Sequence, residues 1–102
     1  MIFRRSRFHE LVERQLDLFA AETELLDEAD DADAAWSRAE ADASEELYGD
    51  YQLVVDAIGE QLYEMRESYA ATLDDAADEY RAAFDTAARK RFGRLTSFLD
   101  EN

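Results

Sequence analysis

Three pairs of acidic residues spaced three apart are the side chains with the clearest potential for chemistry. On a helix such residues share a face, and carboxylates on neighbouring helices can hold Mg²⁺ for phosphate chemistry. The spacing is unspecific here, because 26 of the 102 residues are acidic and such pairs arise by chance on solvated helix faces. The pairs are Glu10/Glu13, Glu64/Glu67 and Asp75/Asp78. They define an alternative function, a metal-dependent all-α phosphohydrolase.

His9 is the one histidine, and Glu13 follows it at the spacing that places two ligands on the same helix face. The chain has no cysteine, so a tight zinc site would need carboxylates from elsewhere. The sequence contains no glycine-rich phosphate loop, and nothing in it anchors a serine to His9 for Ser-His-Asp catalysis. We therefore predict no catalytic residue, no cofactor and no metal site.

The elements that would position these side chains are helices. Apolar residues recur every three or four positions from Phe8 to Ala87, and no proline interrupts them. This spacing follows the 3.6-residue turn and predicts an all-α protein. The predicted core residues are Leu18, Leu25, Trp36, Val54, Ile58, Leu62 and Phe84.

The length of 102 residues predicts a single helical domain over 1–102. Of its 48 apolar residues, 18 are alanine and only 22 are Leu, Ile, Val or Phe. Alanine favours helix and lets helices approach closely, but it gives a thin core. We therefore expect the fold to need a neighbour.

Because the apolar period runs on without a break, the turns must be placed from capping signals. Ser6 is a predicted N-cap, and the first helix is expected over about 6–37, with an alternative turn at 30–33, where three aspartates disfavour a helix interior. Capping boxes at Ser37/Glu40 and Asp42/Glu45 predict that the second helix begins near residue 43.

The second helix is expected to end near residue 72. Thr72 or Asp74 would cap a third helix over about 74–92, which Gly93 would end in a left-handed conformation, leaving a short tail over 93–102. An unbroken second helix would overhang the first by about 25 Å. We therefore favour an antiparallel three-helix bundle over a two-helix hairpin that covers the overhang by dimerising.

Gly49 and Gly59 fall inside the second helix, which indicates close helix crossings. Two interpretations remain for the neighbouring residues Tyr48 and Tyr51. They either pack against a second helix or form a recognition surface.

Charge is segregated along the chain. The net charge is −15, and residues 10–88 alone carry −20, which disfavours binding of nucleic acid. Crowded carboxylates should have raised pKa values, so stability should fall as the pH rises past them and should increase with salt.

Both ends of the chain are basic and carry apolar residues. Their cations either pair with the acidic body and the helix dipole or bind an anionic partner. These residues are Met1, Ile2, Phe3, Arg4, Arg5 and Arg7 at one end and Arg89, Lys90, Arg91, Phe92, Phe98 and Leu99 at the other.

The longest apolar runs are a few residues, far short of the roughly 20 needed to cross a bilayer, and the start lacks the apolar segment of a signal peptide. We expect a cytoplasmic protein with no membrane span. The expected function is that of a non-enzymatic protein interaction or structural module that self-associates as a homodimer.

Overall fold

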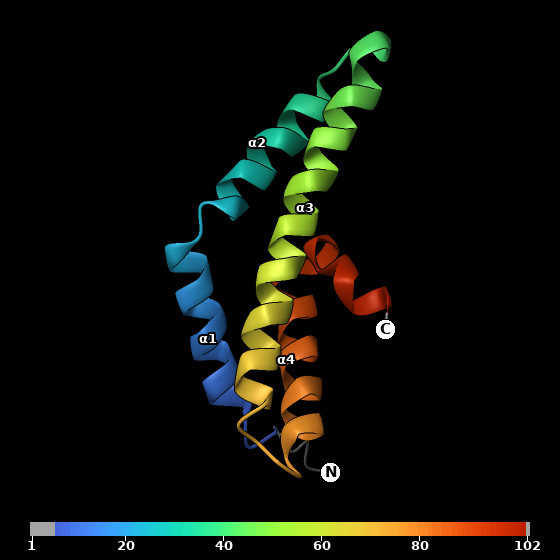
Figure 1. The fold of residues 1–102 in the computed structure, drawn as a ribbon. Helices are drawn as coiled ribbons and strands as arrows, with labels where there is room; N and C mark the ends of the chain where they lie inside the picture. Colours follow the sequence, from blue (N-terminus) through green and yellow to red (C-terminus); the bar gives the residue numbers. More distant parts are fainter. Residues whose placement is uncertain (1–5, 102) are drawn as a thin grey trace, which may run out of the picture.

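The computed structural model describes residues 6–101, with the side chains of all but 97, 98, 100 and 101. Within that range every regular element is helical, which confirms the predicted all-α class. The elements are α1 (His9–Glu22), α2 (Leu25–Ser37), α3 (Ala41–Ala70), α4 (Ala77–Phe92) and a 3₁₀ segment, η1 (Gly93–Glu101) (Figure 1). Of the predicted terminal residues, Met1, Ile2, Phe3, Arg4, Arg5 and the side chain of Phe98 lie outside the described residues.

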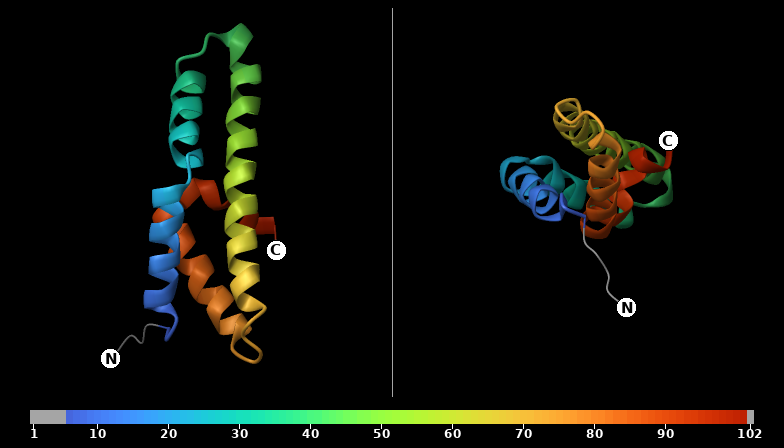
Figure 2. Two further views of the ribbon diagram at one scale, coloured as in Figure 1. Left: turned by 60° about the vertical axis from the view of Figure 1, so that its left-hand side comes forward. Right: turned by 90° about the horizontal axis from the view of Figure 1, so that it is seen from below.

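The molecule is elongated, and α3 runs along it. α2 lies antiparallel beside one half of α3, α4 returns along the other half, and α1 packs on α4 (Figure 2). The principal extents are 51, 32 and 26 Å and the radius of gyration is 15.9 Å, whereas a compact domain of this length has about 13 Å. One end therefore projects as a two-helix hairpin, and we call residues 24–50 the hairpin arm.

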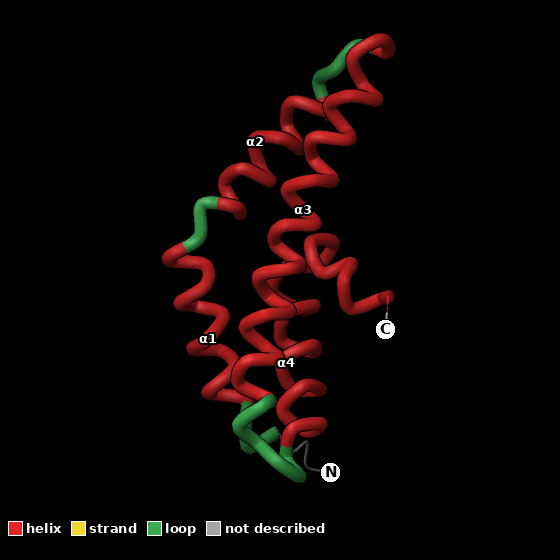
Figure 3. Tube along the Cα trace, viewed as in Figure 1, coloured by secondary structure: helices red, strands yellow, loops and turns green. Residues whose placement is uncertain are grey.

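The predicted first helix over about 6–37 is two helices, because the chain breaks at Thr23 (Figure 3). Thr23 has extended backbone angles, and its Oγ1 accepts a hydrogen bond from the Leu25 amide at 3.1 Å. A threonine hydroxyl that bonds a nearby backbone amide competes with continuation of the helix. The alternative turn at 30–33 is wrong, since these residues lie inside α2.

The predicted capping residues do not cap the helices. Ser6 Oγ accepts the Phe8 amide hydrogen at 3.1 Å, but Ser6 is not the N-cap residue, because α1 begins at His9 after Phe8, which makes no side-chain cap bond. Ser37 and Asp42 lie inside helices and cap neither. α3 begins two residues earlier than predicted, after an N-cap residue that makes no side-chain cap bond.

The turn between α3 and α4 lies where predicted, but its residues act differently. Thr72 does not cap α4, because its hydroxyl donates a hydrogen bond of 2.7 Å to the Tyr69 carbonyl oxygen and so closes the end of α3. Asp74 is not the N-cap residue either, since α4 begins at Ala77. The described residues thus form four α-helices where three were expected.

The hydrophobic core lies where α1, α3, α4 and η1 meet. Of the predicted core residues, Ile58, Leu62 and Phe84 are fully buried, while Leu25, Trp36 and Val54 are half-buried. The buried cluster consists of Val12, Leu16, Phe19, Ala29, Ile58, Leu62, Ala70, Tyr80, Phe84, Ala88 and Leu99.

The prediction of Leu18 as a core residue is wrong, because its side chain is 53% exposed. α1 packs through Val12, Leu16 and Phe19 instead. The sequence-based prediction placed Leu18 and Leu25, seven residues apart, on the same face of one unbroken helix. The break at Thr23 removes that constraint on phase, so α1 can turn a different face to α4.

The segment after α4 is the 3₁₀ segment η1 rather than a tail. Gly93 has a positive φ of 53°, as predicted for the residue after the helix, but its ψ of −118° lies outside the predicted left-handed helical conformation. The buried side chains of Thr96 and Leu99 attach η1 to α3 and α4. The predicted close crossing at Gly49 is wrong, since this glycine is exposed and a Cβ there would meet nothing within 4 Å, whereas Gly59 is buried.

Candidate interaction surface

The acidic pairs are not brought together as a metal site. Glu64 lines an open hollow of about 750 Å³ at the joint of α1 and α2, whereas Glu67 points to arginines on α3 and α4. Asp75 lies in the turn before α4, and Asp78 in the first turn of that helix. Among the side chains that the structure describes, no three of histidine, aspartate or glutamate gather closely enough to hold a metal ion.

His9 and Glu13 share a face of α1, as their spacing predicts. Both line a groove of about 650 Å³ between α1 and α4, whose other lining includes Ala83, Ala87 and Lys90. Glu10, the partner of Glu13 in its pair, is exposed on α1.

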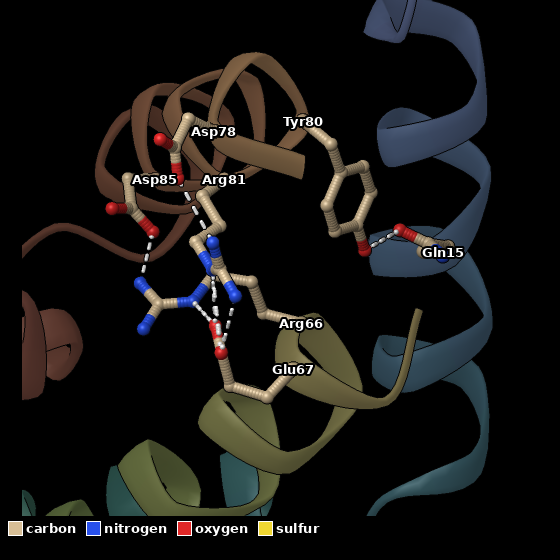
Figure 4. Close-up of polar contacts among 7 residues, drawn as sticks. All are labelled: Gln15, Arg66, Glu67, Asp78, Tyr80, Arg81 and Asp85. Atoms are coloured by element: carbon tan, nitrogen blue, oxygen red, sulfur yellow. Dashed lines mark hydrogen bonds and ion pairs between the residues drawn. The ribbon is translucent and has the colours of Figure 1, made fainter. Parts of the chain in front are cut away.

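Glu67 instead belongs to an ion-pair network that joins α3 to α4 (Figure 4). Arg81 donates to both Glu67 carboxylate oxygens, at 3.0 Å from Nε to Oε2 and 3.0 Å from Nη2 to Oε1. Arg66 donates to Glu67 at 2.9 Å and to Asp85 at 2.7 Å. The Arg66 side chain is only 8% exposed, so its charge is paired where it is buried.

The sequence-based reasoning missed this network, although a signal exists. Arg66 lies four residues after Leu62 and four before Ala70, so helical spacing places it on the core face of α3. It is also the single basic residue between 51 and 76, among six acidic ones. A lone cation on a buried face implies acidic partners on the neighbouring helix.

The network sets the titration of its members. The side-chain hydrogen bond from Arg81, with a further one from Arg66, holds the pKa of Glu67 below its ordinary value. The expectation that crowding raises carboxylate pKa values is therefore wrong at Glu67. Burial raises the pKa of Tyr80 to about 12, and its hydroxyl donates a hydrogen bond to Gln15 at 2.7 Å, which links α4 to α1 (Figure 4).

The arm carries a cluster of aromatic rings. The Trp36 ring centroid lies 5.0 Å from that of Tyr48 and 6.3 Å from that of Tyr51, with the Trp36 and Tyr51 rings stacked. Tyr51 is buried at the base of the arm, Trp36 is half-buried, and Tyr48 is 45% exposed. The packing interpretation thus holds for Tyr51, whereas Tyr48 is partly exposed and its role in a recognition surface stays a prediction.

Arg94 in η1 attaches the base of the arm to the core. Its Nη2 donates to Asp33 Oδ2 at 2.7 Å, and its guanidinium lies 5.7 Å from the centre of the Tyr51 ring. One arginine thus bonds a carboxylate of α2 and contacts an aromatic face of α3. The Arg94 side chain is 64% exposed, so this contact adds a small contribution to the packing of α2 on α3.

The arm also concentrates the negative charge. Residues 24–50 contain 11 acidic residues and Arg38 as the one basic residue, a net charge of −10. Residues 1–23 and 77–102 each balance to zero, and residues 51–76 carry −5. The arm therefore carries two thirds of the net negative charge, and residues 51–76 carry the remaining third.

Cations near the chain ends pair with the protein's own carboxylates. Arg7 Nε lies 3.3 Å from Glu79 Oε2, and Arg91 Nη1 donates a hydrogen bond to Asp17 Oδ1. Arg89, Lys90 and Arg91 occupy the last turn of α4, where they complement the helix dipole. These contacts favour the internal role of the basic residues over an anionic partner.

No helix in the described part of the chain is long and apolar enough to cross a membrane. We compared the chain with models of protein families, with curated proteins and with solved structures, and found no match.

Proposed function

We propose that this protein is a non-enzymatic interaction module that binds another protein through its hairpin arm. The observation that carries this proposal is the partial exposure of the aromatic side chains on the arm. Trp36 and Tyr48 lie between only two helices, so their rings remain partly open to water. All arm residues are described, and among them only Ala29 is buried.

The residue types favour a protein partner. Trp and Tyr supply large apolar contact area with a polar atom at the edge, and they are enriched at the energetic centres of protein interfaces. The two rings lie on neighbouring helices, Trp36 on α2 and Tyr48 on α3, and both are partly exposed, whereas small molecules bind in pockets that enclose most of their surface. A projecting aromatic hairpin on a separate core is suited to docking.

The sequence led us to expect self-association, so a second copy of this chain is the alternative binding partner of the arm. Two arms placed side by side would bring together surfaces of net charge −10 each. Such like charges repel unless salt screens them. We therefore favour a different protein as the partner of the arm and propose self-association only through surfaces outside it.

The test compares two tyrosines of α3 with matched exposure. Tyr48 on the arm is 45% exposed, and Tyr63, below the arm, is 46% exposed. A photo-crosslinking phenylalanine derivative at position 48 should form an adduct with a protein in lysate of the source cells, and the same group at position 63 should not. The captured protein, once purified, should bind Tyr48→Ser at least about tenfold more weakly than the parent and Tyr63→Ser equally well.

Adducts that form equally at both positions, or binding that Tyr48→Ser leaves unchanged, would contradict the proposal. Sedimentation velocity tests whether a second copy of the chain binds the arm. A dimer that forms in dilute salt and is abolished by Tyr48→Ser would assign the arm to self-association instead.

A further inference from the structure

We infer that the partner of the arm presents a positively charged amphipathic helix whose arginine or lysine side chains reach the arm's carboxylates. This inference rests on the proposed docking role of the arm and adds the chemistry of its occupant. Three features of the arm carry it, namely its uncovered length, its aromatic rings with their neighbouring carboxylates, and its charge.

The uncovered part of the arm matches a short helix in length. The lower half of α3 packs against α4 and η1, whereas α2 is the one helix beside its upper half (Figure 2). The ten residues from Ala41 to Asp50 span about 15 Å, or nearly three helical turns. A partner helix of three to four turns would lie along this length and complete a three-helix arrangement with α2 and α3.

The chain itself shows which side chain the arm recognises. At the base of the arm, Arg94 bonds Asp33 and lies over the Tyr51 ring. Arginine is suited to this double role, because its planar guanidinium both bonds carboxylates and stacks on aromatic faces. Further along the arm, the rings of Trp36 and Tyr48 lie 5.0 Å apart, and Glu45 and Glu46, three and two positions before Tyr48 on α3, are exposed.

The charge of the arm sets the sign of the partner. A general requirement for an acidic surface, such as adaptation to high salt, would spread acidic residues over the whole molecule. Instead the arm carries −10 of the total of −15, and the segments that contain α1 and α4 are neutral. A cationic partner is attracted most strongly to this end of the molecule, and a second arm is repelled by it.

The probe is a synthetic peptide of about 16 residues, long enough for four helical turns. Its leucines fall on one helical face and its arginines flank that face. One control peptide has the same composition in shuffled order, so that it has the charge without the apolar face. A second control replaces each arginine with glutamate. Trp36 is the only tryptophan and belongs to the aromatic cluster, so its fluorescence reports binding at the arm.

We expect saturable binding of the amphipathic arginine peptide, at least about tenfold tighter than the shuffled peptide. Binding should weaken as salt increases from about 0.1 M to about 0.5 M. Tyr48→Ser should weaken it at least about tenfold and Tyr63→Ser should not, with circular dichroism confirming that both variants are folded in each buffer.

Equal binding of the shuffled peptide would reduce the effect to charge attraction and overturn the inference. Equal weakening by Tyr63→Ser would place the site elsewhere and would also overturn it. Tight binding of the glutamate peptide, or no binding of any peptide, would refute the cationic partner. The crosslinking comparison of positions 48 and 63 would still decide separately whether the arm docks a protein.

Discussion

The face that α1 turns to α4 can be tested with two leucines of the same helix. Leu16 is fully buried in the core cluster, and Leu18, two positions later, is 53% exposed. Truncating a buried leucine to alanine removes its burial and leaves a cavity, which costs about 2–5 kcal/mol. For Leu16→Ala a value near 3 kcal/mol corresponds to a loss of roughly 12–24 °C in Tm. For Leu18→Ala we expect a change within about 0.5 kcal/mol, because an exposed alanine keeps the helix stable.

Urea unfolding followed by circular dichroism at the helix band measures both variants, and equal m-values would show that the same structure unfolds. The two substitutions are chemically identical and share one helix, so differences in helix propensity cancel between them. An equal loss of stability in the two variants would refute the described packing of α1. A larger loss of stability for Leu18→Ala than for Leu16→Ala would place Leu18 in the core on the same face as Leu25, as a continuous first helix predicts.

Three further predictions concern the ion pairs and the glycines. The arginines lower the pKa of Glu67 in the folded protein. Its ion pairs therefore stabilise the fold fully above the unfolded-state pKa of about 4.3, and this stabilisation is lost as the pH falls through the lower folded-state pKa. Glu67→Gln should therefore reduce stability at pH 7 and flatten the acid side of a stability curve measured by urea unfolding from pH 7 to about pH 3. Arg66→Met should leave stability within about 1 kcal/mol of the parent in urea unfolding, because the paired acids are partly exposed and can be hydrated, while methionine fills the buried stem. Gly49→Ala should raise stability by about 0.5–1 kcal/mol, because Gly49 lies inside a helix with open space around its Cα. Gly93→Ala should lower stability by about 1–3 kcal/mol, because an alanine is strained at a positive φ. Thermal unfolding of the two variants compares these changes directly.

The sequence determines the helical class but not the number of helices. The period of three to four residues survives through Thr23, because the chain on either side of the break keeps apolar residues in a compatible phase. The break depends on one hydrogen bond from the Leu25 amide to the Thr23 hydroxyl and on the packing of α1 against α4. Periodicity carries no information on either contact, which is why the joint and the face of α1 were both missed.

The candidate site was predictable in its residue types and not in its assembly. Trp36 and the tyrosines stand out in a chain with 18 alanines, and their two possible roles follow from their chemistry. Which tyrosine packs and which is exposed depends on contacts between distant segments. At Tyr51 these include Arg94, a residue from a segment that the sequence indicated only as a tail.

The division between arm and core has a consequence for experiments on either part. The buried cluster is built from α1, α3, α4 and η1, and Ala29 is its one member from the fully described arm. Changes to exposed arm residues such as Tyr48 therefore remove little buried area and should leave the fold intact. Changes in the core act on stability without altering the arm's rings or charge. A loss of binding with Tyr48→Ser and a loss of stability with Leu16→Ala thus report on two separate properties of the molecule.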